Sequence, residues 1–349
     1  HSGTVPAVVE GIDVEAVSRW LVDHLGGTQA PFTFERIGTG RSNLTFAVAD
    51  RSGQRFVLRR PPLHHVLATA HDMTREFRAI SALGPTAVPV PDTLGLCTDD
   101  TVNGAPFYAM TLVDGAIVDS IDAARSIETG ARATMAAQLA DVLAELHDLD
   151  VDAIGLGDFA RRDGYIDRQI ARWSKQWELS KTRDLPAVDD VAKQLADRVP
   201  AQQGVAVVHG DYRFGNCVVD PSSGRIAAVL DWELCTLGDP LADVGYVGAH
   251  WAPRDGVAGR HNDPTGAGGF GTFDDFRGRY AERSPRDLSQ IDFYVAFQRW
   301  RTAIILEGVY ARYVGGAYGG QQLGAELDVL RDSPVELVDQ ARAALARLP

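Results

Sequence analysis

The feature that most constrains this chain is a polar loop with apolar residues on both sides of it. Residues 209–216 read HGDYRFGN, and the four residues before them, VAVV, are all apolar. Residues 217–219 and 226–230 are apolar as well, and a turn sequence, PSSG, lies between them. Short apolar runs bounded by turn residues are typical of strands. The pattern predicts a strand that leads into the loop and a hairpin that follows it.

Three polar side chains on this framework have the spacing of a phosphoryl-transfer site. Asn216 lies five positions after Asp211, and Asp231 stands at the end of the predicted hairpin. In kinases one aspartate accepts the proton of the attacking hydroxyl, while an asparagine and a second aspartate hold magnesium. The hairpin would return Asp231 to the neighbourhood of Asn216. We therefore expect Asp211 as the base and Asn216 and Asp231 as magnesium ligands.

Neighbouring residues of the same two segments are expected to support this chemistry. We count His209 and Arg213 with Asp211 as candidate catalytic residues, and expect His209 to fix the loop rather than to transfer protons. Trp232 is expected to pack under the site, and Glu233 to reach a metal-bound water. A purely structural role of the three polar residues is the alternative.

The combined motifs resemble a known protein family. The pattern H-G-D-x-x-x-x-N, then L-D-W-E, then G-D-P-L-A-D at Gly238–Asp243, resembles the aminoglycoside phosphotransferase and choline kinase superfamily. It is similar in particular to the kinase-like domain of certain acyl-CoA dehydrogenase fusion proteins, over roughly residues 30–315. The resemblance implies an α+β, two-lobed protein-kinase-like fold. A small N-terminal antiparallel-sheet lobe for the nucleotide is expected at residues 1–113, and a larger, mainly helical lobe for catalysis and the acceptor at residues 114–349.

The N-terminal residues fit a nucleotide-binding sheet. Strands are expected at residues 32–37, 44–49 and 55–59, followed by a helix from about 71 to 83. The turn between the first two strands is rich in glycine, so its backbone amides can approach phosphate oxygens without a Cβ in the way. A plain hairpin turn is the alternative. The candidate phosphate-binding residues of this turn are Gly38, Gly40, Ser42 and Asn43.

The resemblance assigns further positions to the nucleotide. Arg59 stands where kinases carry the lysine that grips the α- and β-phosphates, and Glu76 would be its partner. Arg60 is the competing arginine, although strand alternation points it away from the face of Arg59. For Glu76 a solvated helix face is the alternative. Backbone groups from Thr111 to Val113 would meet adenine at the hinge between the lobes.

Residues 161–177 carry the clue to the acceptor. If they form one helix, four basic residues fall within about 60° of one another, opposite four apolar ones. Such a stripe favours an anionic acceptor, for example a carboxylate or a coenzyme A ester, over a polycationic aminoglycoside; a solvated face is the alternative. The basic residues are Arg161, Arg168, Arg172 and Lys175, and the apolar ones are Ile166, Ile170, Trp173 and Trp177.

The C-terminal half reads as mainly helical. Apolar spacing predicts a helix that ends near His147, which we expect to cap or pack, and further helices at residues 287–313 and 322–347. Asp239 is expected as the N-cap of a helix with proline at its first position. Asp243, one turn later, is expected to brace the catalytic loop.

A second glycine-rich segment is not expected to bind a dinucleotide. Residues 266–271 match G-x-G-x-x-G, but no strand precedes them, whereas the fingerprint requires strand, turn and helix in order. No G-K-[ST] sequence occurs, which excludes a Walker A loop. We interpret residues 252–272 as a surface loop.

Composition sets the remaining limits. The 349 residues suit two packed lobes, and the net charge of −13 argues against nucleic acid as a partner. No run approaches about 18 apolar residues, so no membrane segment is expected, and no signal peptide is recognised. The first three residues suggest an expression-tag remnant. The three cysteines are scattered without a C-x-x-C pair, so a reducing cytoplasm is expected, and the oligomeric state stays open.

The expected activity is the transfer of the γ-phosphate to a small-molecule hydroxyl, with ATP (or GTP) and magnesium as cofactors. A kinase of a 4-hydroxy acid or hydroxyacyl-CoA is a narrower reading from the resemblance. A non-catalytic nucleotide-binding pseudokinase is an alternative, which arginine in place of the usual lysine keeps open. A protein kinase is disfavoured because no A-P-E-like segment follows Asp231.

Overall fold

The computed structural model describes residues 9–38, 43–63, 72–252, 262–315 and 325–348. The chain divides into two compact units. The first, here called the sheet unit, contains His1–Gly115 together with Ala227–Cys235. The second, called the helical unit, contains Ala116–Ile226 and Thr236–Pro349. The short segment from 227 to 235 therefore belongs with residues more than a hundred positions earlier in the chain.

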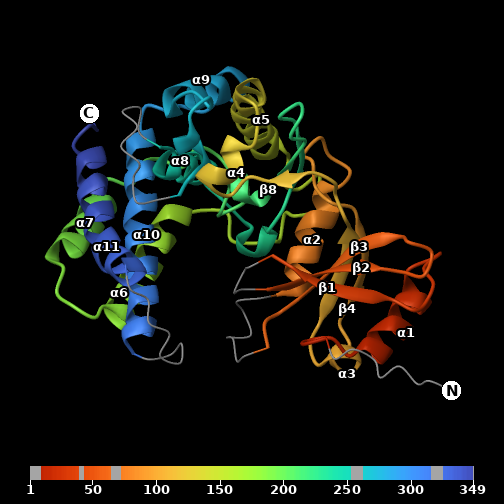
Figure 1. The fold of residues 1–349 in the computed structure, drawn as a ribbon. Helices are drawn as coiled ribbons and strands as arrows, with labels where there is room; N and C mark the ends of the chain where they lie inside the picture. Colours follow the sequence, from red (N-terminus) through yellow and green to blue (C-terminus); the bar gives the residue numbers. More distant parts are fainter. Residues whose placement is uncertain (1–8, 39–42, 64–71, 253–261, 316–324, 349) are drawn as a thin grey trace. The chain divides into compact units, whose positions relative to one another are not determined.

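The sheet unit is built on five antiparallel strands in the order β1-β2-β3-β5-β4 (Figure 1). Along β2 and β3 successive side chains alternate between the two faces, as a pleated strand requires. One face carries Phe46, Val48, Phe56 and Leu58, all almost fully buried against α1. The strands are β1 (Thr33–Ile37), β2 (Leu44–Ala49), β3 (Arg55–Arg60), β4 (Thr93–Cys97) and β5 (Phe107–Thr111).

Three helices complete this unit, α1 (Val14–His24), α2 (Met73–Leu83) and α3 (Asp100–Asn103), with a 3-10 turn at Trp232–Leu234. Asp13 and Asp72 cap α1 and α2, each with a carboxylate that accepts an amide hydrogen bond in the first turn. The buried stripe of α2 contains Met73, Ile80 and Leu83, at the spacing of an apolar helix face. Glu76 lies in the same stripe, so its carboxylate requires a partner inside the unit.

The helical unit holds most of the helices of the described chain. Its small strands are β6 (Ala116–Ile117), β7 (Ala206–Val208), β8 (Cys217–Val219) and β10 (Thr236–Gly238), and β9 (Ile226–Val229) begins at its boundary. Phe214–Asn216 and Pro264–Ala267 are 3-10 turns. The helices are α4 (Ile121–Arg125), α5 (Thr129–Asp148), α6 (Tyr165–Ser180), α7 (Pro186–Ala196), α8 (Leu241–His250), α9 (Phe273–Arg283), α10 (Ile291–Val314) and α11 (Ala325–Leu345).

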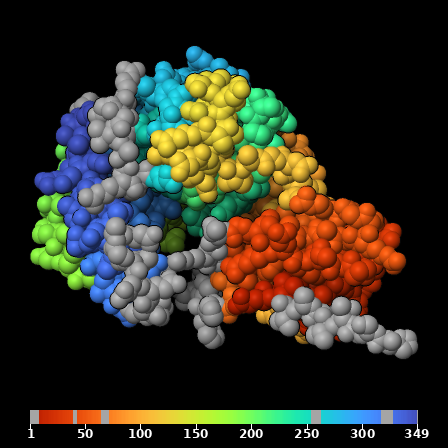
Figure 2. Space-filling model, in the orientation of Figure 1, coloured from red at the N-terminus to blue at the C-terminus, as the bar shows by residue number. Residues whose placement is uncertain are grey.

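The core of the helical unit forms around α10, whose buried side chains include Phe293, Phe297 and Trp300. Gly245 of α8 packs directly on Tyr294 of α10, where any side chain would collide with the tyrosine backbone. On the face drawn in Figure 2, the yellow residues of α5 lie beside the cyan residues of α9. These contacts fix α5, α8 and α10, the helices that approach the polar loop.

A two-stranded ribbon delivers that loop. β7 pairs with β10 in antiparallel register, with Val208 opposite Thr236 and Ala206 opposite Gly238. Loop residues 209–216 therefore start where β10 begins, a few residues before α8. After β8 the chain turns at residues 220–225, where the Asp220 amide donates to the Arg225 carbonyl at 2.9 Å. The strand into the loop and the turn that follows it are as the sequence predicts.

The expected α+β class with a small antiparallel sheet and a mainly helical remainder is confirmed. The predicted strands and the helices at 71–83, 287–313 and 322–347 are present with ends shifted by a few residues. Strand β4 and helices α3 and α7 were not predicted. No helix of the described residues is long and apolar enough to cross a membrane.

Candidate active site

The polar loop is anchored by one buried carboxylate, Asp243 of α8. Its two oxygens accept hydrogen bonds from the backbone amides of His209, at 2.7 Å, and Gly210, at 2.9 Å. Asp243 is fully buried, so these bonds replace the water that the carboxylate would otherwise require. The predicted bracing role of Asp243 is confirmed by this contact.

Asp243 is in turn held by His147, near the end of α5. His147 Nε2 lies 3.4 Å from the carboxylate, and Nδ1 lies 2.9 Å from the Tyr280 hydroxyl of α9. A neutral imidazole fits both contacts by donating from Nε2 and accepting at Nδ1. Burial lowers the pKa of His147, against the opposing effect of Asp243, which favours this neutral form. As expected, His147 packs and braces rather than facing a reactant.

Asp211, the expected base, follows directly in the loop. Asn216 Nδ2 donates to Oδ2 and to the backbone carbonyl of Asp211, both at 2.8 Å. The Tyr246 hydroxyl donates to Oδ1, and Arg213 Nε lies 3.3 Å from the same oxygen. Burial alone raises the pKa of Asp211, but Arg213, Tyr246, His209 and Asn216 outweigh it and lower the pKa. The carboxylate is therefore ionised near neutral pH and fixed in orientation.

Two further residues hold the backbone of this loop. The Asp211 amide donates to His209 Nδ1 at 3.2 Å, so the imidazole closes a tight turn around Gly210. Arg301 of α10 donates to the Gly210 carbonyl at 3.2 Å and stacks over the Tyr246 ring. The position of His209 agrees with the expected role in fixing the loop.

A second polar cluster lies in the sheet unit around Arg59. Its Nε lies 3.0 Å from the Glu76 carboxylate, and a terminal nitrogen is ion-paired with Asp231. Glu233 lies 3.8 Å from that nitrogen and accepts a hydrogen bond from Asn43 at 3.0 Å. Burial works to lower the pKa of Arg59, but the surrounding carboxylates, Glu76 first, outweigh it and raise the pKa. The guanidinium is therefore a permanent cation shared by three acidic side chains.

Asp231 has an unusual backbone conformation. Its φ of 63° lies in the left-handed region, where no other non-glycine residue of the described chain is found. Such a conformation costs roughly 1–3 kcal/mol and is concentrated at functional sites. The next residue, Trp232, is buried, and its indole nitrogen donates to the Val229 carbonyl at 3.0 Å. The turn that Trp232 anchors aims the Asp231 carboxylate at Arg59.

The residues available for a metal ion are oxygen ligands. Asn216 uses its amide nitrogen on Asp211, which leaves Oδ1 to face a cation, and Asp231 retains a second carboxylate oxygen. The described residues contain no group of three or more His, Cys, Asp and Glu side chains placed to hold a metal. Amide and carboxylate oxygens are ligands that magnesium accepts in proteins.

Comparison with known proteins identifies the family. Residues 33–281 match the sequence profile of the phosphotransferase enzyme family. The chain belongs to this family. The match includes both polar clusters and all of the helical unit as far as α9. The expected relationship to aminoglycoside phosphotransferases is confirmed, and a choline/ethanolamine kinase family protein shares the fold.

Three relatives show how far the likeness extends. Acyl-CoA dehydrogenase family member 10 of Mus musculus is 34% identical over 312 residues, which cover 87% of this chain and 29% of that protein. The crystal structure of an inferred aminoglycoside phosphotransferase from Ralstonia eutropha has a TM-score of 0.80 and 33% identity, covering 97% of this chain and 99% of that one. Amicoumacin kinase, solved with AMP-PNP and Ca2+, shares the fold with a TM-score of 0.62 and 16% identity, covering 95% of each chain. The chain spans less than half the length of the curated relatives it matches.

Within this phosphotransferase, the predicted site residues fall into two groups. His209, Asp211, Arg213 and Asn216 come together in the helical unit, and Asn43, Arg59, Glu76 and Asp231 come together in the sheet unit. The expected pairing of Asn216 with Asp231 joins residues of different units and stays a prediction.

The remaining nucleotide candidates have mixed outcomes. Gly38 has φ of 78°, a conformation that suits glycine at a turn, whereas Gly40 and Ser42 lie outside the described residues. The Thr111 amide donates to the Asp92 carbonyl at 2.9 Å, so that donor is already used inside the sheet unit. Val113 follows β5 outside any strand.

Arg60 points away from Arg59, as strand alternation predicts. It donates to the carbonyls of Gly11 and Asn103 on the α1 side of the sheet. It is 6% exposed and therefore serves to anchor the N-terminal segment. The competing assignment of Arg60 to the phosphates has no support in this geometry.

The basic stripe at residues 161–177 is only partly present, which corrects one expectation. Helix α6 begins at Tyr165, because Gly164 adopts φ of 63° and interrupts the helical path, so Arg161 is not on the helix. Arg168 folds back onto the Arg161 carbonyl at 2.8 Å. Arg172 lies over the Trp173 ring, at 5.6 Å from its centroid. The expected apolar side is confirmed for Ile166, Ile170 and Trp177, which are buried.

A second correction concerns the start of α8. Pro240, rather than Asp239, is the N-cap, because the chain first forms a tight turn in which Ala242 donates to the Asp239 carbonyl. Asp239 still accepts from the Leu241 amide at 3.0 Å, as a capping carboxylate would, and from the Tyr294 hydroxyl at 2.7 Å. Asp239 therefore has the predicted structural role, although it lies one residue before the N-cap and not at it.

Sequence reasoning missed Tyr246, which contacts the candidate base directly. The sequence contains a signal for this residue, because Tyr246 lies three residues after Asp243 on α8 and helical periodicity places both on one face. Tyr246 and Asp211 also line a cavity of about 470 Å³ together with Asp119, Arg213 and His250. A cavity is therefore present beside the candidate base.

Proposed function

We propose that the chain is a small-molecule O-phosphotransferase that uses ATP and magnesium to phosphorylate a hydroxyl group. The observation that carries the proposal is the state of Asp211. Its carboxylate is ionised, oriented by Tyr246 and Asn216, and faces a cavity of about 470 Å³. Membership in the phosphotransferase enzyme family supports the same reaction class.

The roles of the side chains follow from their positions. Asp211 aligns the acceptor hydroxyl and takes its proton, and Arg213 stabilises charge beside it. His209 and Asp243 keep the loop rigid, so the Asp211 carboxylate does not have to be reoriented in each catalytic cycle. Asn216 and Asp231 would hold magnesium, and the bound ion would neutralise phosphate charge.

The nucleotide is assigned to the sheet unit. Arg59 is a permanent cation oriented by Glu76, as a phosphate-gripping residue must be, and Gly38 to Asn43 would supply backbone amides. We propose residues 1–113 as the nucleotide lobe and residues 114–349 as the catalytic and acceptor lobe. Segment 227–235 belongs to the sheet unit, so Asp231 lies in the same unit as Arg59. AMP-PNP in the structure of amicoumacin kinase supports a nucleoside triphosphate, with ATP proposed ahead of GTP.

A second candidate concerns the acceptor. Relatives named acyl-CoA dehydrogenases contain this region within a longer chain, which favours a hydroxy acid or hydroxyacyl-CoA as the substrate. Arg172 and Lys175 on the outer side of α6 are consistent with such an anion. The net charge of −13 also disfavours nucleic acid.

A pseudokinase is the remaining alternative, since Arg59 is occupied by Asp231 in this structure. The alternatives separate on turnover. ADP release with magnesium should be measured against aminoglycosides, hydroxy acids and hydroxyacyl-CoAs in parallel. A phosphorylated product from one class would establish the reaction and the acceptor together. Nucleotide binding without turnover against every class would support the pseudokinase instead.

A further inference from the structure

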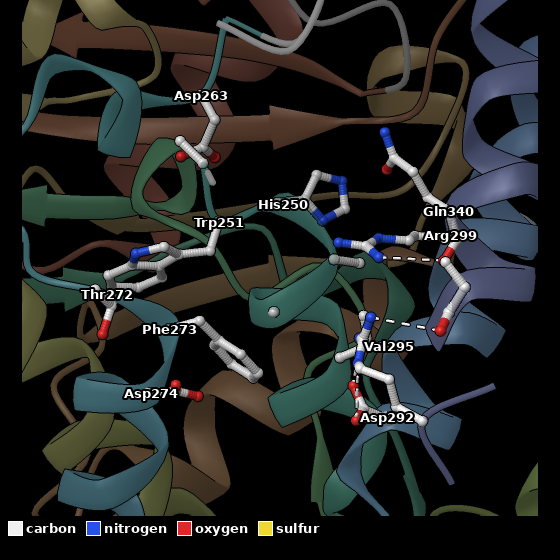
Figure 3. Close-up of a pocket in the computed structure, with 15 residues that line it drawn as sticks. His250, Trp251, Asp263, Thr272, Phe273, Asp274, Asp292, Val295, Arg299 and Gln340 are labelled. Carbon is white, nitrogen blue, oxygen red and sulfur yellow. Dashed lines mark hydrogen bonds and ion pairs between the residues drawn. The ribbon is translucent and has the colours of Figure 1, made fainter. Parts of the chain in front are cut away.

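A second cavity, of about 570 Å³, lies in the helical unit (Figure 3). It is enclosed by the end of α8, the start of α9, one side of α10 and the last turns of α11. Trp251, Phe273, Val295 and Ala343 give it apolar walls. Its volume is in the range of small-molecule sites, which typically combine apolar walls with a few polar groups.

The acidic side chains at this cavity have partners in the chain itself. Asp292 is ion-paired with Arg347, and both residues line the cavity. Asp274 pairs with Arg277 at 3.0 Å. Asp263 accepts hydrogen bonds from a neighbouring amide and hydroxyl. The carboxylates of Asp292 and Asp274 are therefore paired with arginines, and Asp263 is hydrogen-bonded within the chain.

Arg299 of α10 is the exception. Its hydrogen bond to the Gln340 carbonyl is long, at 3.4 Å (Figure 3), and no carboxylate of the described residues lies within ion-pair distance of its guanidinium. Its Nε is buried without a hydrogen-bond partner. Burial and then the nearby Arg347 lower the pKa of Arg299, while Asp292 raises it. Arg299 is half-buried, and an anion in the cavity would supply the acceptor that its buried Nε lacks, together with an opposite charge.

The cavity is adjacent to the candidate base. His250 and Asp263 line both this cavity and the smaller one that contains Asp211. The two spaces are thus separated by side chains and not by a layer of the fold. A ligand that places a hydroxyl at Asp211 can extend past His250 toward Arg299.

We propose that this second cavity binds the anionic end of the acceptor, with Arg299 as the counter-charge. The ligand class is an organic anion with an apolar body and a carboxylate or phosphate ester group. The planar guanidinium binds either group through paired hydrogen bonds, and the apolar walls pack against the body. Naming the ligand as the acceptor rests on the proposed function, whereas the binding itself does not.

The test is direct binding in the absence of nucleotide. Octanoate, octyl phosphate and octan-1-ol are titrated calorimetrically into the wild-type chain and into Arg299→Met, Arg299→Lys and Arg283→Met. Arg283 pairs with Asp141 and does not line the cavity, so Arg283→Met is the control that removes one arginine elsewhere in the chain. We expect at least one anion to bind about tenfold or more tightly than octan-1-ol, and Arg299→Met to remove that difference.

Arg299→Lys should retain part of the preference, and Arg283→Met all of it. Whichever anion depends on Arg299 identifies the head group, carboxylate or phosphate ester. Unchanged octan-1-ol binding and melting temperature in Arg299→Met show that the cavity is intact. Equal affinity for the anions and octan-1-ol, or anion binding unaffected by Arg299→Met, would overturn the proposal.

The two proposals fail separately. If anions bind through Arg299 but no hydroxylated compound is phosphorylated, the anion site stands and the phosphotransferase function does not. If neutral hydroxyl compounds are phosphorylated equally well by the wild type and Arg299→Met, and the anions do not bind, the function stands and the anion site is wrong.

Discussion

At the scale of single residues, the proposed mechanism depends on how the Asp211 carboxylate is oriented and kept ionised. A carboxylate in a partly buried loop would tend to protonate, yet its hydrogen bonds to Tyr246 and Asn216 and its contact with Arg213 keep its pKa low. Asp211 and Asn216 were predictable because a five-residue spacing within one loop is local. Tyr246 was not predicted, because helical spacing places it on the face of Asp243 but its contact with Asp211 also depends on where α8 packs.

Tyr246→Phe should lower kcat by about tenfold, the usual effect of removing one hydrogen bond to a charged group. The bond holds the pKa of Asp211 down, so its loss raises that pKa. The acid limb of the kcat/KM profile should then move to higher pH, because more of the base is protonated at a given pH. A pH–rate series compares the variant with the wild type and with Tyr310→Phe on α10. An unchanged acid limb in Tyr246→Phe would show that Tyr246 does not lower the pKa of Asp211.

At the scale of secondary-structure elements, the loop is positioned by three helices through a chain of buried polar contacts. α8 provides Asp243, α5 provides His147 and α9 provides Tyr280. Each side chain supplies a hydrogen-bond partner to the next one, which is the condition for a buried polar network to stabilise a fold. Loss of one member leaves the others unpaired in the interior.

Asp243→Ala should destabilise the protein by about 3–5 kcal/mol, because it leaves two backbone amides and His147 without their acceptor. Denaturant unfolding measures the change. Asp197→Ala is the control, since Asp197 is exposed and pairs with Lys193 at the end of α7. That control should change the free energy of unfolding by less than about 0.5 kcal/mol. Similar losses in the two variants would argue against the brace.

The pH dependence of stability should report on His147. Its pKa in the folded chain is lowered from 6.5, so the unfolded chain binds the proton more readily. The contribution is therefore fully present above pH 6.5 and is lost as the pH falls toward the folded pKa. His147→Gln should flatten the fall in unfolding free energy below pH 6.5, measured by denaturant melts at several pH values. An identical slope in the variant would mean that other groups cause the acid loss.

Elements with strong periodicity were predictable, and those set by glycine conformation or by tertiary contacts were not. β2 alternates between buried and half-buried residues along its length, and the sequence placed both β2 and β3 within one residue. The helix at 161–177 was extended too far because the positive φ of Gly164 is not visible in the periodicity. Strand β4, with the sequence TLGLC, has too little alternation to be recognised and exists because it pairs with β5.

At the scale of the whole molecule, the described chain consists of a sheet unit and a helical unit that divide the candidate residues between them. Arg59 and the candidate metal ligand Asp231 belong to the first, and the candidate base Asp211 belongs to the second. The sequence motifs predicted that Arg59 and Asp211 lie in different parts of the chain, but they placed Asp231 in the C-terminal lobe. The expected closeness of Asn216 and Asp231 stays a prediction, because the two residues belong to different units.

Nucleotide should stabilise the molecule only together with magnesium. At a ligand concentration of one hundred times Kd, binding contributes about 2.7 kcal/mol, which corresponds to a rise in Tm of roughly 5 °C. Melting scans with ATP and magnesium, and with ATP and EDTA, measure this effect. Asp231→Asn should lose most of the magnesium-dependent part. An equal rise in Tm with EDTA would show that the metal ligands are wrongly assigned.

The measurement that tests the central claim most directly is γ-phosphate transfer by Asp211→Asn beside the wild type, with nucleotide binding recorded in both. Asparagine keeps the size and the hydrogen-bond acceptor but cannot take a proton. The account predicts that transfer falls by at least about a thousandfold while the Kd for ATP and magnesium changes less than about threefold. Transfer at the wild-type rate in Asp211→Asn would contradict the assignment of the base and the mechanism built on it.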